Sequence, residues 1–293
     1  MRLPATTATI VAAFIIAAGG PARADDANRV RALSYDTATD LVVTSMGALW
    51  LVASELYKAD LAPETCRWCY RTADGTDALN PYDGWVRRQL VWRETRGADV
   101  ASSVVAFAVT PAAGFGLTAA AAAHDGAIRG APADALVITE ATVIAASVNQ
   151  IAKFAFGRER PFVHFLPREP NGSHAATDNP ADDNLSFFSG HTTLAFALAT
   201  SSGTVATMRN YRLAPVVWGA GLTAATTAGY LRIAADKHYL TDVITGVVVG
   251  SLIGAAVPLV FHSPAAEPAA SSVNGAATVA PAAVMPWSIG GAF

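Results

Sequence analysis

Five long apolar segments, separated by short polar stretches, constrain the fold of this chain more than any other feature. They cover residues 101–123, 135–152, 189–208, 213–231 and 240–261. Their lengths are typical of helices and exceed those of ordinary strands. They are rich in Ala, Gly and Thr, whose small side chains let helices pack closely. The sequence therefore predicts an all-α helix bundle.

Polar clusters lie at the ends of three of these segments, so a bundle can bring all three to one end. The clusters contain Lys153 with Arg160, then Ser189-Gly190-His191, then Arg232 with His238 and Asp242. Together they supply fixed cations, imidazoles, a hydroxyl and a glycine N–H, which are groups that bind and transform an anion. If the last segment is helical, His238 and Asp242 share a face, and a carboxylate beside an imidazole fixes its tautomer.

The three clusters resemble the three signatures of the type 2 phosphatidic acid phosphatase and vanadium haloperoxidase superfamily. Lys153 with Arg160-Pro161 is similar to KxxxxxxRP, Ser189-Gly190-His191 to PSGH, and Arg232 with His238 and Asp242 to SRxxxxxHxxxD. Phe188 stands where the second signature has Pro, and Leu231 where the third has Ser. With the flanking segments, the resemblance covers roughly residues 101–261.

The resemblance implies a role for each matched residue. His238 looks like a nucleophile that forms a phosphohistidine, oriented by Asp242. His191 looks like the acid that protonates the leaving oxygen and then activates water. The phosphate oxygens would be held by Lys153, Arg160, Ser189, Gly190 and Arg232. Fixed cations would take the part that Mg²⁺ plays elsewhere, so we expect no metal and no cofactor at this site.

The N-terminus has the three parts of a secretory signal. Arg2 precedes an apolar run over residues 8–18, and Ala22-Arg23-Ala24 has the pattern of a cleavage site. The alternative is an uncleaved anchor. We therefore expect a signal peptide over 1–24, an N-terminal helical region over 25–100, the phosphatase bundle over 101–262 and a disordered tail over 263–293.

The two cysteines of the chain, Cys66 and Cys69, form a C-x-x-C in the hydrophilic part of the N-terminal region. A zinc site would need further ligands that the neighbouring sequence lacks. A local disulfide is the expected state in an oxidising compartment. The alternative is a redox-active pair, which lacks the thioredoxin context here.

The number of membrane crossings decides which way the bundle end faces. We expect residues 41–56 to form a packed or interfacial helix, because a crossing needs about 20 apolar residues. Five crossings starting at residue 101 then place all three clusters and both cysteines in the periplasm of a bacterial cell, with the tail in the cytoplasm. The alternative is a soluble periplasmic enzyme. In the loop before Ser189, His164 and His174 are expected to be solvated.

Composition limits the class of partner. Hydrophobic residues make up 52% of the chain and charged residues 15%, and the formal net charge is −3. A negative charge disfavours nucleic acid as a partner. We expect a phosphorylated lipid or a small phosphate ester as substrate, with three other classes open: a soluble acid phosphatase, a vanadium-dependent haloperoxidase, and a phosphate-binding protein without activity. The sequence does not predict the oligomeric state.

Overall fold

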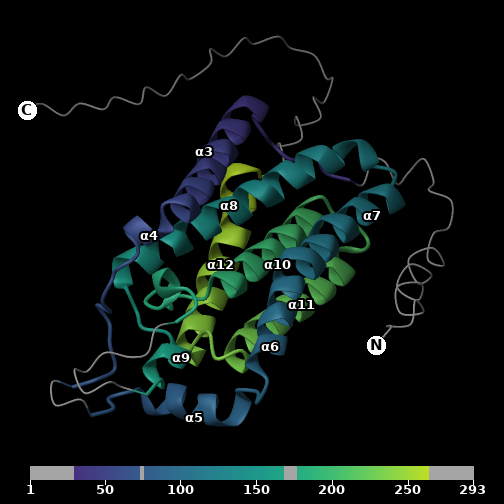
Figure 1. The fold of residues 1–293 in the computed structure, drawn as a ribbon. Coiled ribbons are helices and arrows are strands. Elements are labelled where there is room, and N and C mark those ends of the chain that lie inside the picture. The colour runs from purple at the N-terminus through teal and green to yellow at the C-terminus, as the bar shows by residue number, and fades with distance from the viewer. Residues whose placement is uncertain (1–29, 73–75, 168–176, 264–293) are drawn as a thin grey trace, which may run out of the picture.

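The chain forms a bundle of long helices in the computed structural model, which describes residues 30–72, 76–167 and 177–263 (Figure 1). These ranges contain no β-strand, and the predicted all-α fold is confirmed. The α-helices are α3 (Thr37–Leu56), α4 (Lys58–Leu61), α5 (Pro81–Leu90), α6 (Thr95–Val104), α7 (Leu117–His124), α8 (Ala131–Phe156), α9 (Pro161–His164), α10 (Gly190–Met208), α11 (Ala214–Ala234) and α12 (Leu240–Phe261).

Helix α10 lies at the centre of the bundle, where it packs against α8, α11 and α12. Nearly all of its residues are buried. On α12, Gly246, Gly250 and Gly254 recur every four residues and lie against the α10 backbone. A Cβ at Gly250 would be 2.5 Å from the carbonyl oxygen of Thr193. These glycines therefore let the two helices approach more closely than side chains would allow.

Four stretches are long and apolar enough to cross a membrane: Thr37–Leu56, Thr95–His124, Ile128–Phe156 and Leu240–Phe261. The second is a continuous helix that joins α6 to α7 through two π-helical segments, Val105–Val109 and Ala112–Gly116. The expected segments 189–208 and 213–231 do form helices, α10 and α11, but neither is among the four.

Helix α3 differs from the expectation of a short interfacial helix. The sequence suggested a start near Leu41, but the helix begins at Thr37, where the Asp36 side chain accepts a hydrogen bond from the Thr39 N–H at 2.8 Å. The resulting 20 residues suffice for a crossing, and large apolar side chains such as Met46 and Leu49 are about two-thirds exposed. The prediction was therefore wrong about the length of this helix.

The bundle has two distinct ends. The C-terminal ends of α3, α8 and α11, the N-terminal end of α10 and the segment that leads into α12 meet at one end, because their residues line a common cavity. Helices α5 and α9 lie at this same end, in the lower part of Figure 1. The start of α3 and the end of α12 lie at the opposite end, where the Ser34 N–H donates to the Ser263 carbonyl at 3.2 Å.

Candidate functional site

A cavity of about 530 Å³ opens at the end of the bundle where the three polar clusters meet. Six of the eight residues predicted for catalysis or phosphate binding line it. They are Lys153, Arg160, Gly190, His191, Arg232 and His238. Residues that are as far apart as 153 and 238 in sequence thus face one space, as the positions of the clusters predicted.

Lys153 projects from the last turn of α8 toward the first residue of α10. A Cβ added at Gly190 would be 3.1 Å from the Lys153 Nζ and 2.9 Å from the Asn149 Oδ1. Asn149 also donates a hydrogen bond to the Phe188 carbonyl at 2.7 Å, which fixes the segment that leads into α10. A glycine is therefore required where the helix N-terminus meets the lysine.

The two arginines of the cavity are held by acidic groups. The Arg160 Nε donates to the Asp182 carbonyl at 2.7 Å, and its guanidinium lies 3.7 Å from the Asp182 carboxylate. Arg232 donates to Asp99 at 2.5 Å and to the Ser102 hydroxyl at 3.0 Å. These contacts orient both guanidinium groups toward the cavity before an anion enters.

Two further cations line the cavity that the motif analysis did not select. The Lys58 Nζ lies 3.3 Å from Asp182, and the Lys237 Nζ lies 3.7 Å from Asp99. Each acid therefore contacts one arginine and one lysine. Lys58 follows α3 directly, which links the N-terminal region to the site.

The ring of His238 is held by a main-chain carbonyl. Its Nδ1 lies 2.8 Å from the Ser186 carbonyl oxygen, which can only accept. Nδ1 is therefore protonated and donates a hydrogen bond to that oxygen. The other ring nitrogen, Nε2, then has a free electron pair. Burial lowers the pKa of His238 well below its usual value, and the positive charges of Arg160 and Arg232 lower it further.

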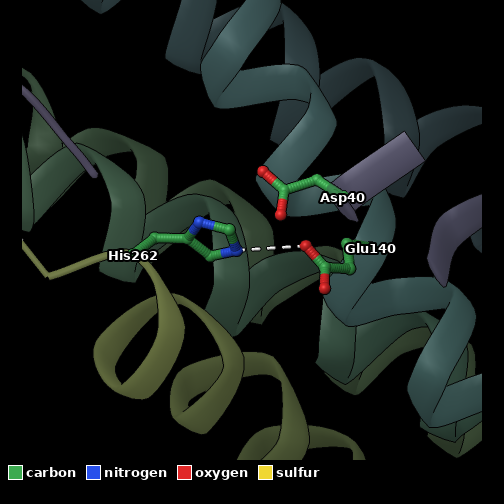
Figure 2. Close-up of side chains that lie close together, drawn as sticks. All are labelled: Asp40, Glu140 and His262. Atoms are coloured by element: carbon green, nitrogen blue, oxygen red, sulfur yellow. Dashed lines mark hydrogen bonds and ion pairs between the residues drawn. The ribbon is translucent and has the colours of Figure 1, made fainter. Parts of the chain in front are cut away.

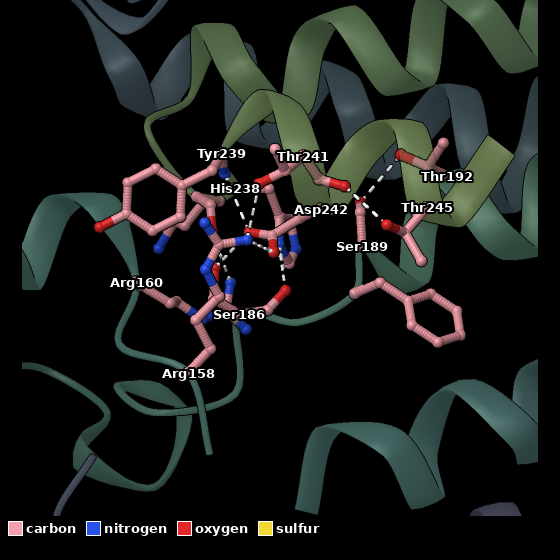
Figure 3. A network of polar contacts seen from close by, with 12 residues as sticks. Arg158, Arg160, Ser186, Ser189, Thr192, His238, Tyr239, Thr241, Asp242 and Thr245 are labelled. Atoms are coloured by element: carbon pink, nitrogen blue, oxygen red, sulfur yellow. Dashed lines mark hydrogen bonds and ion pairs between the residues drawn. The ribbon is translucent and has the colours of Figure 1, made fainter. Parts of the chain in front are cut away.

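Asp242 does not form the expected hydrogen bond with His238. Its Oδ2 lies 3.6 Å from the His238 Nδ1, which is too long for one. Instead it accepts from the Ser186 hydroxyl at 2.6 Å and from the Tyr239 N–H at 3.0 Å. Hydrogen bonds therefore connect Asp242 to His238 through Ser186, whose hydroxyl contacts the aspartate and whose carbonyl contacts the imidazole (Figure 3).

Arg158 is the main residue that motif reasoning missed. Its side chain is completely buried and contacts both Asp242 and Asp83, the latter at 2.9 Å (Figure 3). Its guanidinium also lies 4.5 Å from the ring centroid of Trp68 and 4.4 Å from that of Tyr239. The residue lies within the first signature, but its spacing gave no sign that it would be buried.

His191 lies in the first turn of α10 and lines the cavity. Its Nε2 lies 3.2 Å from the Ser103 hydroxyl of α6. The ring of Phe107 packs edge-on against the imidazole, with 4.8 Å between the ring centroids. Helix α6 and the π-helical segment after it therefore position this histidine, a contribution that no motif indicated.

Ser189 and Asp242 are not among the residues that line the cavity. Ser189 is fully buried, and its hydroxyl accepts a hydrogen bond from the Thr192 hydroxyl at 2.8 Å. Its main-chain N–H donates to the Asp242 carbonyl at 3.1 Å. Ser189 therefore joins α10 to α12, and the expected contact of its hydroxyl with a phosphate is not available in this arrangement.

A disulfide joins Cys66 and Cys69 in the structure. The loop that it closes runs beside residues 157–159, where the Trp68 N–H faces the Gly157 carbonyl at 3.4 Å and the Glu159 N–H donates to the Trp68 carbonyl at 3.3 Å. The loop therefore places the Trp68 ring against Arg158.

His164, which was expected to be solvated, is fully buried. Its two ring nitrogens lie 3.1 Å from Glu159 and 3.2 Å from Asp77. That prediction was wrong, because the fold brings Asp77 from 87 positions away and buries His164 together with Glu159, five positions before it. His174 and most of the predicted tail lie outside the described residues.

The fold and the cavity define a helical protein with a cationic, two-histidine pocket suited to phosphate. Residues 134–264 match the model of the PAP2 superfamily. A search of curated proteins found no match. The superfamily supports phosphatase-type activity, that is, the hydrolysis of phosphoric esters.

Proposed function

We propose that this protein is a metal-independent phosphatase that removes a phosphate or diphosphate group from a lipid through a phosphohistidine on His238. The observation that supports it best is the cavity itself, which joins a cationic end to an apolar wall. Its cations are Lys58, Lys153, Arg160, Arg232 and Lys237, and its apolar residues are Leu51, Phe107, Ala146 and Leu194.

The positions of the apolar residues favour a substrate with a hydrocarbon chain. Leu51 lies one turn before Glu55, and Phe107 lies two turns after Asp99, so both are deeper in the bundle than the charged end. A phosphate held by the cations would direct its ester substituent along these side chains. Phosphatidic acid, an isoprenyl diphosphate and a lipid A phosphate all fit this description.

The first chemical step transfers the phosphoryl group to the enzyme. The Nε2 of His238 attacks phosphorus, and the bond from phosphorus to the leaving oxygen breaks. His191, in its protonated form, gives a proton to that oxygen. Negative charge on the equatorial oxygens is stabilised by the lysine and arginine side chains, with the N-terminus of α10 adding its N–H groups.

The second step returns the enzyme to its starting state. Neutral His191 takes a proton from water, and the resulting hydroxide attacks phosphorus. The bond between phosphorus and the His238 Nε2 breaks, and inorganic phosphate leaves. Throughout, the Ser186 carbonyl accepts a hydrogen bond from the Nδ1–H and keeps Nε2 directed into the cavity.

Phosphate release by the purified protein in detergent tests this proposal. The assay compares a phosphatidic acid, an isoprenyl diphosphate and a water-soluble aryl phosphate, in the presence of EDTA. We expect turnover of a lipid and little turnover of the aryl phosphate. Activity confined to the aryl phosphate would instead support a soluble acid phosphatase, and bromide oxidation that depends on vanadate would support a haloperoxidase.

Two substitutions test the mechanism. His238→Ala and His191→Ala should each reduce hydrolysis by roughly 10³-fold or more, since both steps need both rings. The wild type and His191→Ala retain the proposed nucleophile, and phosphohistidine survives alkali but not acid. Reactions with radiolabelled substrate that are quenched in alkaline denaturant should therefore show no labelled protein for His238→Ala. His124→Gln, which alters a histidine at the opposite end of the bundle, is the control. Near-normal activity in His238→Ala would contradict the mechanism.

A further inference from the structure

A second cluster of ionisable groups lies in the bundle, far from the phosphate cavity. Asp40 of α3, Glu140 of α8 and His262 at the end of α12 face one another (Figure 2). One ligand atom from each lies within 4.8 Å of the others. Glu140 precedes Lys153 by 13 positions on α8, a distance of about 20 Å along the helix. The cluster is therefore separate from the proposed catalytic site.

The contacts of His262 define which ring nitrogen faces the acids. Its Nδ1 lies 3.1 Å from the Ser34 carbonyl oxygen, which can only accept, so Nδ1 carries a proton. Its Nε2 lies 3.0 Å from the Glu140 Oε2. A histidine that ligates a metal has this same arrangement, with one nitrogen donating to a carbonyl and the other directed at the ion.

The charges of the cluster are not balanced by the protein around it. Among the described residues, no Lys or Arg side chain forms an ion pair with Asp40 or Glu140. Asp40 is only 6% exposed, and its Oδ2 has no hydrogen-bond partner in the described structure. A buried carboxylate oxygen without a hydrogen-bond partner lowers the stability of the folded state, so a bound cation or a proton at this oxygen would be stabilising.

We propose that Asp40, Glu140 and His262 bind a divalent transition-metal ion, with Zn²⁺ the best match. One imidazole nitrogen and two carboxylate oxygens are ligands that Zn²⁺ accepts, whereas Mg²⁺ prefers oxygen ligands alone. Tetrahedral Zn²⁺ needs ligand atoms about 3.3 Å apart, so the cluster requires only a small contraction.

The ion would join three helices that are distant in sequence. Helix α3 packs mainly on α8, and the end of α12 closes the same end of the bundle. Metal binding would therefore stabilise the attachment of α3, whose C-terminal end supplies Leu51 and Glu55 to the phosphate cavity. This role is structural and goes beyond the proposed hydrolysis, in which the ion takes no part.

Metal content and thermal unfolding of the full chain in detergent test the proposal. The protein is stripped with a chelator, exchanged into chelator-free buffer and titrated with ZnCl₂, MnCl₂ or MgCl₂. We expect one tightly bound Zn²⁺ per chain after gel filtration and a rise in Tm of several degrees, with a smaller rise for Mn²⁺ and none for Mg²⁺. Neither readout depends on phosphatase activity.

Two near-isosteric variants and one control complete the experiment. Asp40→Asn and His262→Gln should each weaken Zn²⁺ binding by about 100-fold or more and remove the Tm rise, because loss of a partner behind a ligand already costs about 10–100-fold. His124→Gln, which alters a histidine beside Asp125 at the same end of the bundle, should bind Zn²⁺ like the wild type. Absence of Zn²⁺ uptake by the wild type, or equal uptake by wild type and Asp40→Asn, would overturn the proposal. If the wild type takes up no metal and the Tm of Asp40→Asn is higher than that of the wild type, a shared proton balances the cluster instead.

Discussion

His238, the proposed nucleophile, shows how its surroundings can set the tautomer of a single residue. The Ser186 carbonyl accepts a hydrogen bond from the Nδ1–H at 2.8 Å, so the free electron pair is on the nitrogen that faces the cavity. A main-chain acceptor cannot be protonated, unlike a carboxylate, and it keeps this tautomer over a wide pH range. Asp242 supports the arrangement from one step away, through the Ser186 hydroxyl.

The lowered pKa of His238 leads to a prediction about stability and pH. Its pKa in the folded protein is well below the ordinary value of 6.5, because of burial and then of nearby cations. Below pH 6.5 the unfolded chain therefore binds a proton that the folded chain does not, and stability falls as the pH falls. Thermal unfolding between pH 8 and 5 should show a larger loss of Tm for the wild type than for His238→Asn. Equal losses would contradict this assignment.

At the scale of elements, Arg158 connects α5 and α12 to the cysteine loop. It contacts Asp83 of α5 and Asp242 of α12, while Trp68 packs on its guanidinium. Arg158→Ala would leave two buried carboxylates without their cation, a change that costs about 3–5 kcal/mol. We expect a large fall in Tm and, because Asp242 holds Ser186, a fall in kcat as well.

A conservative change separates charge from geometry at this position. Arg158→Lys keeps the positive charge but cannot bridge both acids, so its Tm and kcat should lie between those of wild type and Arg158→Ala. Arg67→Ala is the matched control, because Arg67 lies in the same loop and makes exposed contacts to the Phe154 and Ala155 carbonyls at 3.3 Å. Wild-type behaviour of Arg158→Lys would show that the forked geometry is unimportant.

The contact between α10 and α12 gives a second prediction at this scale. Gly250→Ala would place a methyl group 2.5 Å from the Thr193 carbonyl oxygen and force the helices apart, at a cost of about 1–3 kcal/mol. Gly219→Ala on α11 is the control, because a Cβ there meets nothing within 4 Å and alanine favours helix. Thermal unfolding should therefore show a lower Tm for Gly250→Ala and an equal or higher one for Gly219→Ala.

At the scale of the whole molecule, the structure constrains how the chain can cross a membrane. The start of α3 and the end of α12 share one end, and the cavity and the disulfide share the other. We propose that the cavity faces the periplasm, an oxidising compartment. A reporter fused after Phe261 should then be active in the cytoplasm. A periplasmic reading would contradict this orientation and favour the soluble form.

The first membrane crossing depends on the mature N-terminus. If α3 spans the membrane and the cavity is periplasmic, the chain before Thr37 is cytoplasmic, which a cleaved secretory signal would not allow. N-terminal sequencing of the purified protein separates the alternatives. A mature start near Asp25 would favour the soluble periplasmic form, because the Ser34–Ser263 hydrogen bond keeps the start of α3 on the same side as the end of α12. A start at Met1 would favour α3 as a crossing helix.

The sequence by itself determined the helices and the composition of the phosphate pocket. Apolar runs of helical length are local features, and the signatures with Lys153, Arg160, His191, Arg232 and His238 specify residue types at fixed spacing. Because each cluster ends a helix, their meeting at one end followed from the number and order of the segments.

Only the tertiary structure decided which polar groups are buried and with whom they pair. Arg158 and Asp83 are 75 positions apart, and Asp40 and His262 come from opposite ends of the described chain. A charged residue in a sequence looks the same whether it faces solvent or an opposite charge in the interior. That difference depends on helix packing, which in turn depends on contacts between segments that no local pattern records.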